Sequence, residues 1–154
     1  MTGSFTYTPI GVFRTPYLTT QAIPKPLGEA PTADAVIEVD PAYADGLLDI
    51  ERFSHLLVLF AFHQSTARPL RVYPPGQTRE RGVFATRSPH RPNAIGILTV
   101  ELTRREGTQL FVRGVDVVDG TPVLDIKPYL RHFDCRPEAT LGWIEGDGKV
   151  KPPP

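Results

Sequence analysis

The segment HLLVLFAF, residues 55 to 62, is apolar at almost every position and indicates the fold class more clearly than any other segment. An apolar run of this length is typical of a strand that is covered on both faces, so it is the predicted central strand. Four further runs rich in β-branched and aromatic residues surround it and are also predicted strands. They are FTYTPIGVF at 5–13, AVIEV at 35–39, IGILTVELT at 95–103 and QLFVRGVDVV at 109–118.

Proline limits the helices. The 17 prolines interrupt nearly every potential long helix. Residues 40–53 predict one short helix, with Asp40 as its N-cap and Pro41 at its first position. The REGTQ segment at 105–109 predicts a hairpin turn. Because closure removes the exposed edges of so many strands, we predict a mainly β protein, a small single-domain β-barrel with one or two short helices.

Length, charge and cysteine content exclude several classes of protein. A chain of 154 residues suits one domain, predicted over 1–145, with a flexible tail at 146–154. The 17 basic and 17 acidic side chains balance, so any nucleic-acid affinity must come from a local patch. The single Cys135 and the lack of a signal or membrane-spanning segment favour a reducing, cytoplasmic setting without membrane contact. No metal-ligand spacing and no glycine-rich phosphate loop occur, so no metal site is predicted.

An arginine- and proline-rich motif, RSPHRPN at 87–93, interrupts two apolar runs. Its prolines fix their own φ angles and extend the residues before them, which predicts a rigid arm without ladder hydrogen bonds. At three residues per polyproline turn, Arg87, His90 and Asn93 would share one face and suit a carboxylate, a phosphate or a nucleoside. The alternative is a stiff turn whose arginines pair with surface acids.

Two other segments carry candidate functional side chains. DVVDGTPVLDIKPY at 116–129 contains a strong turn signal at Asp119 and Gly120, and its apolar VLDI run predicts a buried Asp125. The alternative is that this segment serves only as a hairpin turn and has no functional side chain. His63 and Gln64 end the most apolar strand, where polar groups either face a ligand or serve the structure. Without further information, these patterns predict a β-rich protein that binds a small polar ligand.

Four motifs together give a more specific interpretation. In order and spacing, the chain resembles the TsaA/TrmO-like family in IGVFRTPY, FSHLLVLFAFHQ, GVFATRSPHRPNAIGI and DGTPVLDIKPY. The resemblance covers about residues 7–144. It implies a small β-barrel that acts as an S-adenosylmethionine-dependent methyltransferase, with the cofactor near the interface of a homodimer. The implied product is the N6-methylated form of threonylcarbamoyl-adenosine at position 37 of a tRNA.

The resemblance also implies cofactor-binding residues. A loop that the family often writes as P-R-Q is Pro-Lys-Pro here, and Ala94 replaces a usual proline. The chain also ends where longer family members continue into a second, smaller domain. The cofactor positions that follow from the matched motifs are Pro24, Lys25, His63, Gln64, Arg87, Ile97, Asp116, Asp119, Gly120 and Thr121.

The expected chemistry suggests catalytic residues and an RNA surface. An adenine N6 amine must lose a proton, so Asp125 and Tyr129 are candidate proton acceptors. Lys127 would contact a threonylcarbamoyl carboxylate or neutralise Asp125. Residues 68–91 hold six arginines against one acid, which predicts contact with a tRNA anticodon loop or else a solvated loop. The arginines chosen for this contact are Arg68, Arg71, Arg79 and Arg81.

Two other functions stay open at this point. The same pocket could serve a module that binds S-adenosylmethionine or a nucleotide without turnover. A methyltransferase acting on a small molecule or on another RNA is also compatible with these residues.

Overall fold

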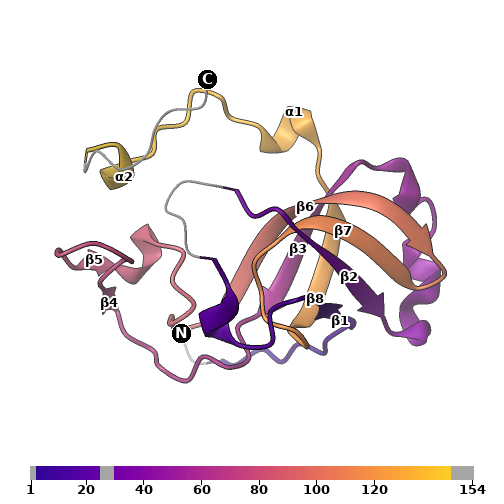
Figure 1. The fold of residues 1–154 in the computed structure, drawn as a ribbon, viewed down its shortest axis with the longest axis horizontal. Coiled ribbons are helices and arrows are strands. Elements are labelled where there is room, and N and C mark those ends of the chain that lie inside the picture. The colour runs from indigo at the N-terminus through magenta and orange to yellow at the C-terminus, as the bar shows by residue number, and fades with distance from the viewer. Residues whose placement is uncertain (1–2, 25–29, 147–154) are drawn as a thin grey trace.

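Six antiparallel strands close into a barrel in the computed structural model, which describes residues 3–24 and 30–146 (Figure 1). Around the barrel the strand order is β1-β2-β7-β6-β3-β8. The predicted β-barrel is therefore confirmed. Its strands are β1 (Gly11–Arg14), β2 (Ala33–Val39), β3 (His55–Ala61), β6 (Ile95–Glu106), β7 (Gln109–Val115) and β8 (Pro122–Pro128).

A separate two-stranded sheet and six short helices complete the described chain. The small sheet pairs β4 (Arg71–Val72) with β5 (Arg81–Gly82). The 3-10 helices are η1 (Thr20–Ala22), η2 (Pro41–Leu47), η3 (Ile50–Arg52) and η4 (Val83–Ala85), and the α-helices are α1 (Arg131–Asp134) and α2 (Trp143–Gly146). The predicted helix at 40–53 forms η2 and η3, and Asp40 caps η2 by accepting a hydrogen bond from the Ala42 amide at 2.8 Å.

The core fills the barrel with side chains from alternate strand positions. In β3, Leu56 and Val58 are fully buried and Phe60 is 2% exposed, whereas Leu57 and Leu59 point outward and are half-buried. Strand alternation explains this, because only one face of each strand meets the interior. The apolar run therefore does form a central strand between β6 and β8, but its outer face is incompletely covered.

Gly96 leaves room for the largest side chain in this part of the core. This side chain belongs to Phe60 on β3, which lies opposite Gly96 on β6, in register. A Cβ atom at Gly96 would overlap the Phe60 ring. The ring in turn packs edge-on against Phe13, with 6.1 Å between ring centroids, and against Phe62 at 5.0 Å. Glycine at 96 is thus a packing requirement of this aromatic cluster.

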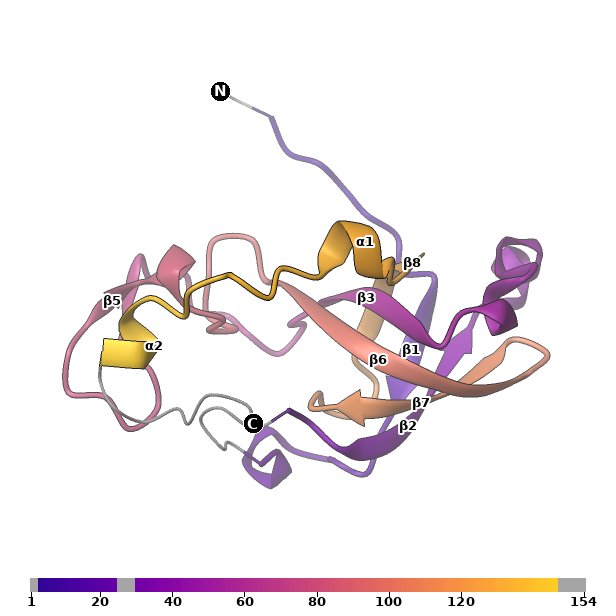
Figure 2. The same ribbon diagram turned by 90° about the horizontal axis from the view of Figure 1, so that it is seen from above.

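A long excursion, residues 63–93, leaves the barrel between β3 and β6 and carries β4, β5 and η4 (Figure 1). Its base is closed by the Phe62 amide, which donates to the Ala94 carbonyl at 2.8 Å. Inside it, the Val83 amide donates to the Leu70 carbonyl at 2.9 Å. Figure 2 shows the excursion extending to one side of the barrel, beside α2.

Several strand boundaries differ from the sequence-based expectation: β2 begins two residues earlier, at Ala33, and β6 continues three residues further, to Glu106. The predicted strand at 5–13 is ordered as a strand only from Gly11, since residues 3–9 are exposed and make no ladder. β7 ends at Val115 rather than at residue 118, because the chain turns toward β8. β8 itself was not among the predicted strands. Apart from residue 146, the predicted tail lies outside the described residues.

Within the described ranges, no helix has both the length and the apolar character needed to cross a membrane.

Candidate functional site

Most of the predicted cofactor positions lie at one end of the barrel, where β3 ends and β6 begins; we call this the excursion end. His63 and Gln64 form the exposed turn after β3, and Asp116 follows the last residue of β7. The turn from Asp119 to Thr121 precedes β8. Antiparallel pairing brings these strand ends together, because β3 is adjacent to β6 and β8, and β6 is adjacent to β7.

Arg87 comes from the excursion and acts electrostatically on Asp116. Asp116 is an exposed residue, yet the protein atoms gathered around its carboxyl raise its pKa. A backbone hydrogen bond and the charge of Arg87 each lower the pKa and offset part of this effect. Two predicted site residues that are remote in sequence thus lie near enough for the charge of the Arg87 guanidinium to act on the partly desolvated carboxyl of Asp116.

The arm around Arg87 is held by hydrogen bonds from its own side chains. The ring of His90 shares a hydrogen bond between its Nδ1 atom and the Oγ atom of Ser65 at 2.8 Å, and Ser65 is only 9% exposed. Arg91 donates to the Thr86 carbonyl at 3.1 Å. Residues 87–93 belong to no strand, in line with the predicted lack of ladder hydrogen bonds, and the side chains of His90 and Arg91 hold the segment in place. Ser65 was missed by the sequence analysis, although it is a small polar residue directly after the His63–Gln64 pair.

The turn at 119–121 uses its polar groups to fasten the end of β1. The Asp119 carboxylate accepts a hydrogen bond from the Thr15 amide at 3.0 Å, and its second oxygen lies 3.8 Å from Arg14 Nη1. Gly120 has φ +76° and donates its amide to the Phe13 carbonyl at 2.8 Å. The Thr121 hydroxyl is buried and donates to the Val118 carbonyl at 2.7 Å. The side chains of Asp119 and Thr121 thus have protein partners of their own.

Two predicted cofactor positions precede β2. Pro24 is exposed and follows η1, between the end of β1 and the start of β2 at the excursion end. Lys25 lies outside the described residues.

Ile97 belongs to the outer face of the barrel. It is 48% exposed and pairs with Leu59, which pairs on its other side with Asp125 of β8. Ile95, 41% exposed, lies one outward position nearer the excursion end. With the outward Leu57, these residues form an apolar strip across β3 and β6.

The predicted catalytic residues follow one another along β8. Asp125 Oδ2 lies 2.7 Å from Lys127 Nζ, and the other carboxylate oxygen accepts the Ile126 amide at 2.9 Å. The expectation that Asp125 is buried is wrong, since its side chain is 47% exposed. Strand alternation turns Ile126 toward the core and directs Asp125 and Lys127 outward.

Tyr129 lies at the opposite end of the barrel from the excursion. Its amide donates to the His55 carbonyl at 3.0 Å, and its ring packs against that of His55 with 6.3 Å between centroids. The seven-residue strand β8 separates it from the turn at Gly120, a rise of about 20 Å at the usual spacing of strand residues. Within one chain, the structure does not bring Tyr129 together with Arg87.

The predicted RNA-binding arginines have different surroundings. Arg68 donates to the carbonyls of Ser65 and Ala67 at 2.8 and 2.9 Å, so it stabilises the excursion. Arg71 lies 3.9 Å from Glu80, and Arg79 is exposed. Arg81 packs over the Trp143 ring, 4.9 Å from its centroid.

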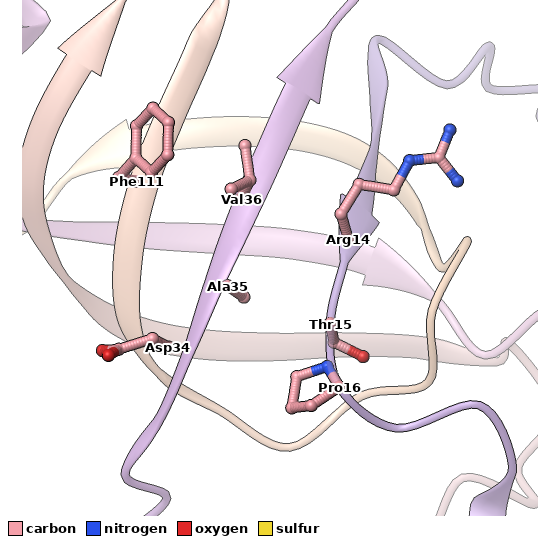
Figure 3. A pocket seen from close by; sticks show the side chains of 7 residues that line it. All are labelled: Arg14, Thr15, Pro16, Asp34, Ala35, Val36 and Phe111. Carbon is pink, nitrogen blue, oxygen red and sulfur yellow. The ribbon is translucent and has the colours of Figure 1, made fainter.

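A surface hollow of about 350 Å³ lies between the end of β1 and strands β2 and β7 (Figure 3). Its charged side chains already form ion pairs, Arg14 with Glu38 at 2.7 Å and Asp34 with Arg113 at 2.9 Å. None of the predicted cofactor positions lines it. We therefore place the candidate site around Arg87, Asp116 and the His63–Gln64 turn, and not in this hollow. Among the described residues, no cluster of three or more histidine, cysteine, aspartate or glutamate side chains could hold a metal ion.

Comparison with known proteins finds relatives whose names refer to S-adenosylmethionine or to tRNA methylation. The chain is 46% identical over 127 residues to an S-adenosyl-L-methionine-binding protein of Archaeoglobus fulgidus, covering 82% of this chain and 91% of that protein. It is 39% identical over 155 residues to the tRNA (adenine(37)-N6)-methyltransferase of Escherichia coli, covering 92% of this chain and 65% of the enzyme. The alignment thus leaves about a third of the Escherichia coli enzyme unmatched.

Solved structures agree with the sequence comparison. The crystal structure of TrmO from Pseudomonas aeruginosa matches with a TM-score of 0.77 and 37% identity, covering 98% of this chain and 66% of that one. Residues 12–135 match the family described as the tRNA-methyltransferase O N-terminal domain. That span includes the barrel strands from Val12 onward, the excursion and the candidate site. The chain belongs to the tRNA-methyltransferase O N-terminal domain family.

Proposed function

We propose that this protein is an S-adenosylmethionine-dependent methyltransferase that methylates N6 of adenosine 37 in tRNA. The observation that carries the proposal is the gathering of Arg87, Asp116, His63 and Gln64 at the excursion end, in a barrel 39% identical to an enzyme named for this reaction. We extend the proposal to threonylcarbamoyl-adenosine as the modified nucleoside and to the cytoplasm as the location.

The residues at the excursion end fit the proposed cofactor. S-adenosylmethionine carries a carboxylate, an ammonium group and ribose hydroxyls, which need a cation, an anion and hydrogen-bonding groups. Arg87 supplies a guanidinium, and the carboxyl of Asp116 accepts from an amine or a hydroxyl. Surrounding protein atoms partly desolvate the carboxyl of Asp116 and so raise its pKa, which is consistent with a group that a polar ligand would stabilise. We assign Ile97 to apolar contact and Pro24 and the turn at 119–121 to the border of the site, and we keep Lys25 as a proposed cofactor residue.

Methyl transfer requires alignment of the donor with the acceptor more than activation of either. When bound, the cofactor supplies an electrophilic methyl group on a sulfonium. The protein then has to hold an acceptor amine in line with it and exclude water, which can contribute about 7–11 kcal/mol at best. Rigid strand ends and the hydrogen-bonded arm at 87–93 serve this alignment.

The acceptor amine must also lose a proton, and we propose Asp125 as the group that receives it. Of the predicted catalytic residues, Asp125 lies nearest the excursion end of β8. Lys127 forms an ion pair with this carboxylate at 2.7 Å and can contact a threonylcarbamoyl carboxylate. We propose that Tyr129, at the far end, contributes through the partner subunit of a dimer.

The dimer is proposed because the outer face of the barrel is apolar near the site. Ile95 and Ile97 are exposed on β6, and Leu57 and Leu59 are only half-buried on β3. Burial of such a strip against its two-fold copy would remove the incomplete cover described above. It would also place the cofactor near the interface.

The proposed tRNA contact is the basic surface of the excursion. Arg71 and Arg79 face solvent, and Arg81 and Arg68 fix the fold of the same segment. Unstacked loop bases are the usual targets of RNA recognition, and the reacting amine has to leave the stack to reach a bound sulfonium.

A second candidate function is cofactor binding without turnover, favoured by the name of the Archaeoglobus fulgidus relative. Incubation of the protein with labelled S-adenosylmethionine and total tRNA, followed by nucleoside analysis, distinguishes the two. We expect label in an N6-methylated adenosine. Label in a small molecule or in another nucleoside would refute the tRNA assignment, and binding without any transfer would support the second function.

A further inference from the structure

The tryptophan of α2 contacts the excursion near the candidate site. The Nε1–H group of Trp143 donates to the Ala85 carbonyl at 2.8 Å, across 58 positions of sequence. The Arg81 guanidinium stacks over the same ring at 4.9 Å from its centroid. Both views of the ribbon show α2 beside this part of the excursion (Figures 1 and 2). One side chain from near the end of the described chain thus holds β5 and η4 together.

This contact acts on the backbone that leads to Arg87. Ala85 is the last residue of η4, and Arg87 follows it by two positions. Between them, the Thr86 hydroxyl donates to the Val83 carbonyl at 2.9 Å, which closes the turn on itself. Val83 of η4 is 1% exposed but is not part of the core cluster of the barrel, so η4 depends on contacts within its own surroundings, of which this is one.

We propose that Trp143 is a positioning residue that fixes η4 and thereby holds Arg87 in the geometry needed to bind the cofactor. This inference rests on the proposed function, because cofactor binding at Arg87 is its consequence. Trp143 lies on α2 and reaches Arg87 only through the backbone of η4. Without its contact, the arm has to be ordered during binding, and the entropy lost then lowers affinity.

Thermodynamic linkage supplies a reciprocal consequence. If the Trp143 contact favours the form that binds cofactor, then bound cofactor must favour the Trp143 contact by the same factor. Trp143 is the only tryptophan of the chain, so its fluorescence reports on this contact alone.

The first experiment compares wild type, Trp143→Phe and Trp143→Ala by calorimetry with S-adenosylhomocysteine. Loss of one neutral hydrogen bond in Trp143→Phe is expected to weaken binding by about 3-fold, and loss of hydrogen bond and ring stacking in Trp143→Ala by about 10-fold or more. Phe133→Ala is the matched control, since Phe133 is an exposed aromatic on the other α-helix. It should bind as wild type does.

The second experiment separates positioning from general stability. Amide hydrogen exchange without ligand should accelerate in residues 83–90 of Trp143→Ala, while the barrel strands and the melting temperature stay as in wild type. In wild type, S-adenosylhomocysteine should reduce the quenching of Trp143 by acrylamide. Should Trp143→Ala fail to fold, Trp143→Phe provides the same comparisons.

Two other outcomes are informative, and each would refute a different proposal. Equal affinity and equal exchange in wild type and both variants, with wild type binding the ligand, would overturn the positioning role and leave the proposed function intact. A folded wild type that binds no S-adenosylhomocysteine would refute the proposed cofactor site and the role of Trp143 with it.

Discussion

Arg87 lies close enough to Asp116 for its charge to lower the pKa of that carboxyl, although burial raises the pKa by more. Replacing Arg87 by alanine should therefore raise the pKa of Asp116 further, while Arg87→Lys should leave it nearly unchanged. Carbon-detected NMR titration of the Asp116 carboxyl measures this directly. An identical titration curve in wild type and Arg87→Ala would show that the two groups are not coupled.

The raised pKa of Asp116 also has a consequence for stability. A carboxyl with a raised folded-state pKa costs stability only when it is charged, so the cost grows as pH rises through the usual aspartate range and the folded pKa. Asp116→Asn should consequently gain stability over wild type at pH 7 and lose this advantage below about pH 3.5, under the usual aspartate pKa. Urea unfolding at both pH values is the measurement.

Arg87 should also be the main charged contact of the cofactor. Loss of a charge-assisted hydrogen bond costs about 1.5–3 kcal/mol, so Arg87→Ala should weaken S-adenosylhomocysteine binding by about 10- to 100-fold. The control is Arg104→Ala, which removes an exposed arginine that pairs with Glu106 at 2.8 Å on the barrel. Calorimetry that finds equal affinities for the two variants would remove Arg87 from the site.

Gly96 should tolerate no larger residue beneath Phe60. Gly96→Ala forces the new Cβ into the ring, and overpacking of this kind costs about 1–3 kcal/mol. Gly82→Ala is the control, because an added Cβ there meets open space. Chemical denaturation compares them, and a Gly96→Ala protein as stable as Gly82→Ala would mean that the aromatic cluster can rearrange.

The apolar strip should mediate self-association. Ile97→Glu introduces a charge into a surface that dimerisation would dehydrate, and we expect light scattering to show a monomer at micromolar concentration. Ile97→Val, which keeps the apolar character, should remain dimeric. A wild type that is monomeric with cofactor present would contradict the proposed dimer.

Basic residues of the excursion should guide tRNA. The double change Arg71→Glu and Arg79→Glu should reduce tRNA methylation much more than cofactor affinity and flatten the salt dependence of tRNA binding, by about 0.7–0.9 in slope for each lost phosphate contact. Arg81 is unsuitable for this test because it packs on Trp143. Unchanged salt dependence would place the RNA on another surface.

The barrel could be predicted from the sequence because its strands carry strong local signals. The run at 55–62 and the alternation after Ile95 mark β3 and β6, and Gly107, with φ +59°, occupies the predicted hairpin turn. Strand β8 was not predicted, because its polar residues resemble a turn region. Only its pairing with β3 and β1 turns them outward.

The site was predictable in its members but not in its arrangement. Motif resemblance selected Arg87 and Asp116, which the fold brings together. Periodicity could not show that Asp125 faces solvent or that Tyr129 lies at the far end, since both depend on which strand face meets the core. The contact of Trp143 with Ala85 spans too much sequence for any local pattern to reveal.

The hydrogen bond from the Phe62 amide to the Ala94 carbonyl closes the base of the excursion, which therefore forms a separate structural unit that we call a cassette. Its two ends leave from paired neighbours, Ala61 on β3 and Ile95 on β6, so the segment can lengthen, shorten or be exchanged without shifting the register of either strand. Arg87 and the proposed tRNA-contacting arginines all belong to that cassette. A chimera that receives the corresponding segment of a relative would therefore inherit a new recognition surface on an unaltered barrel.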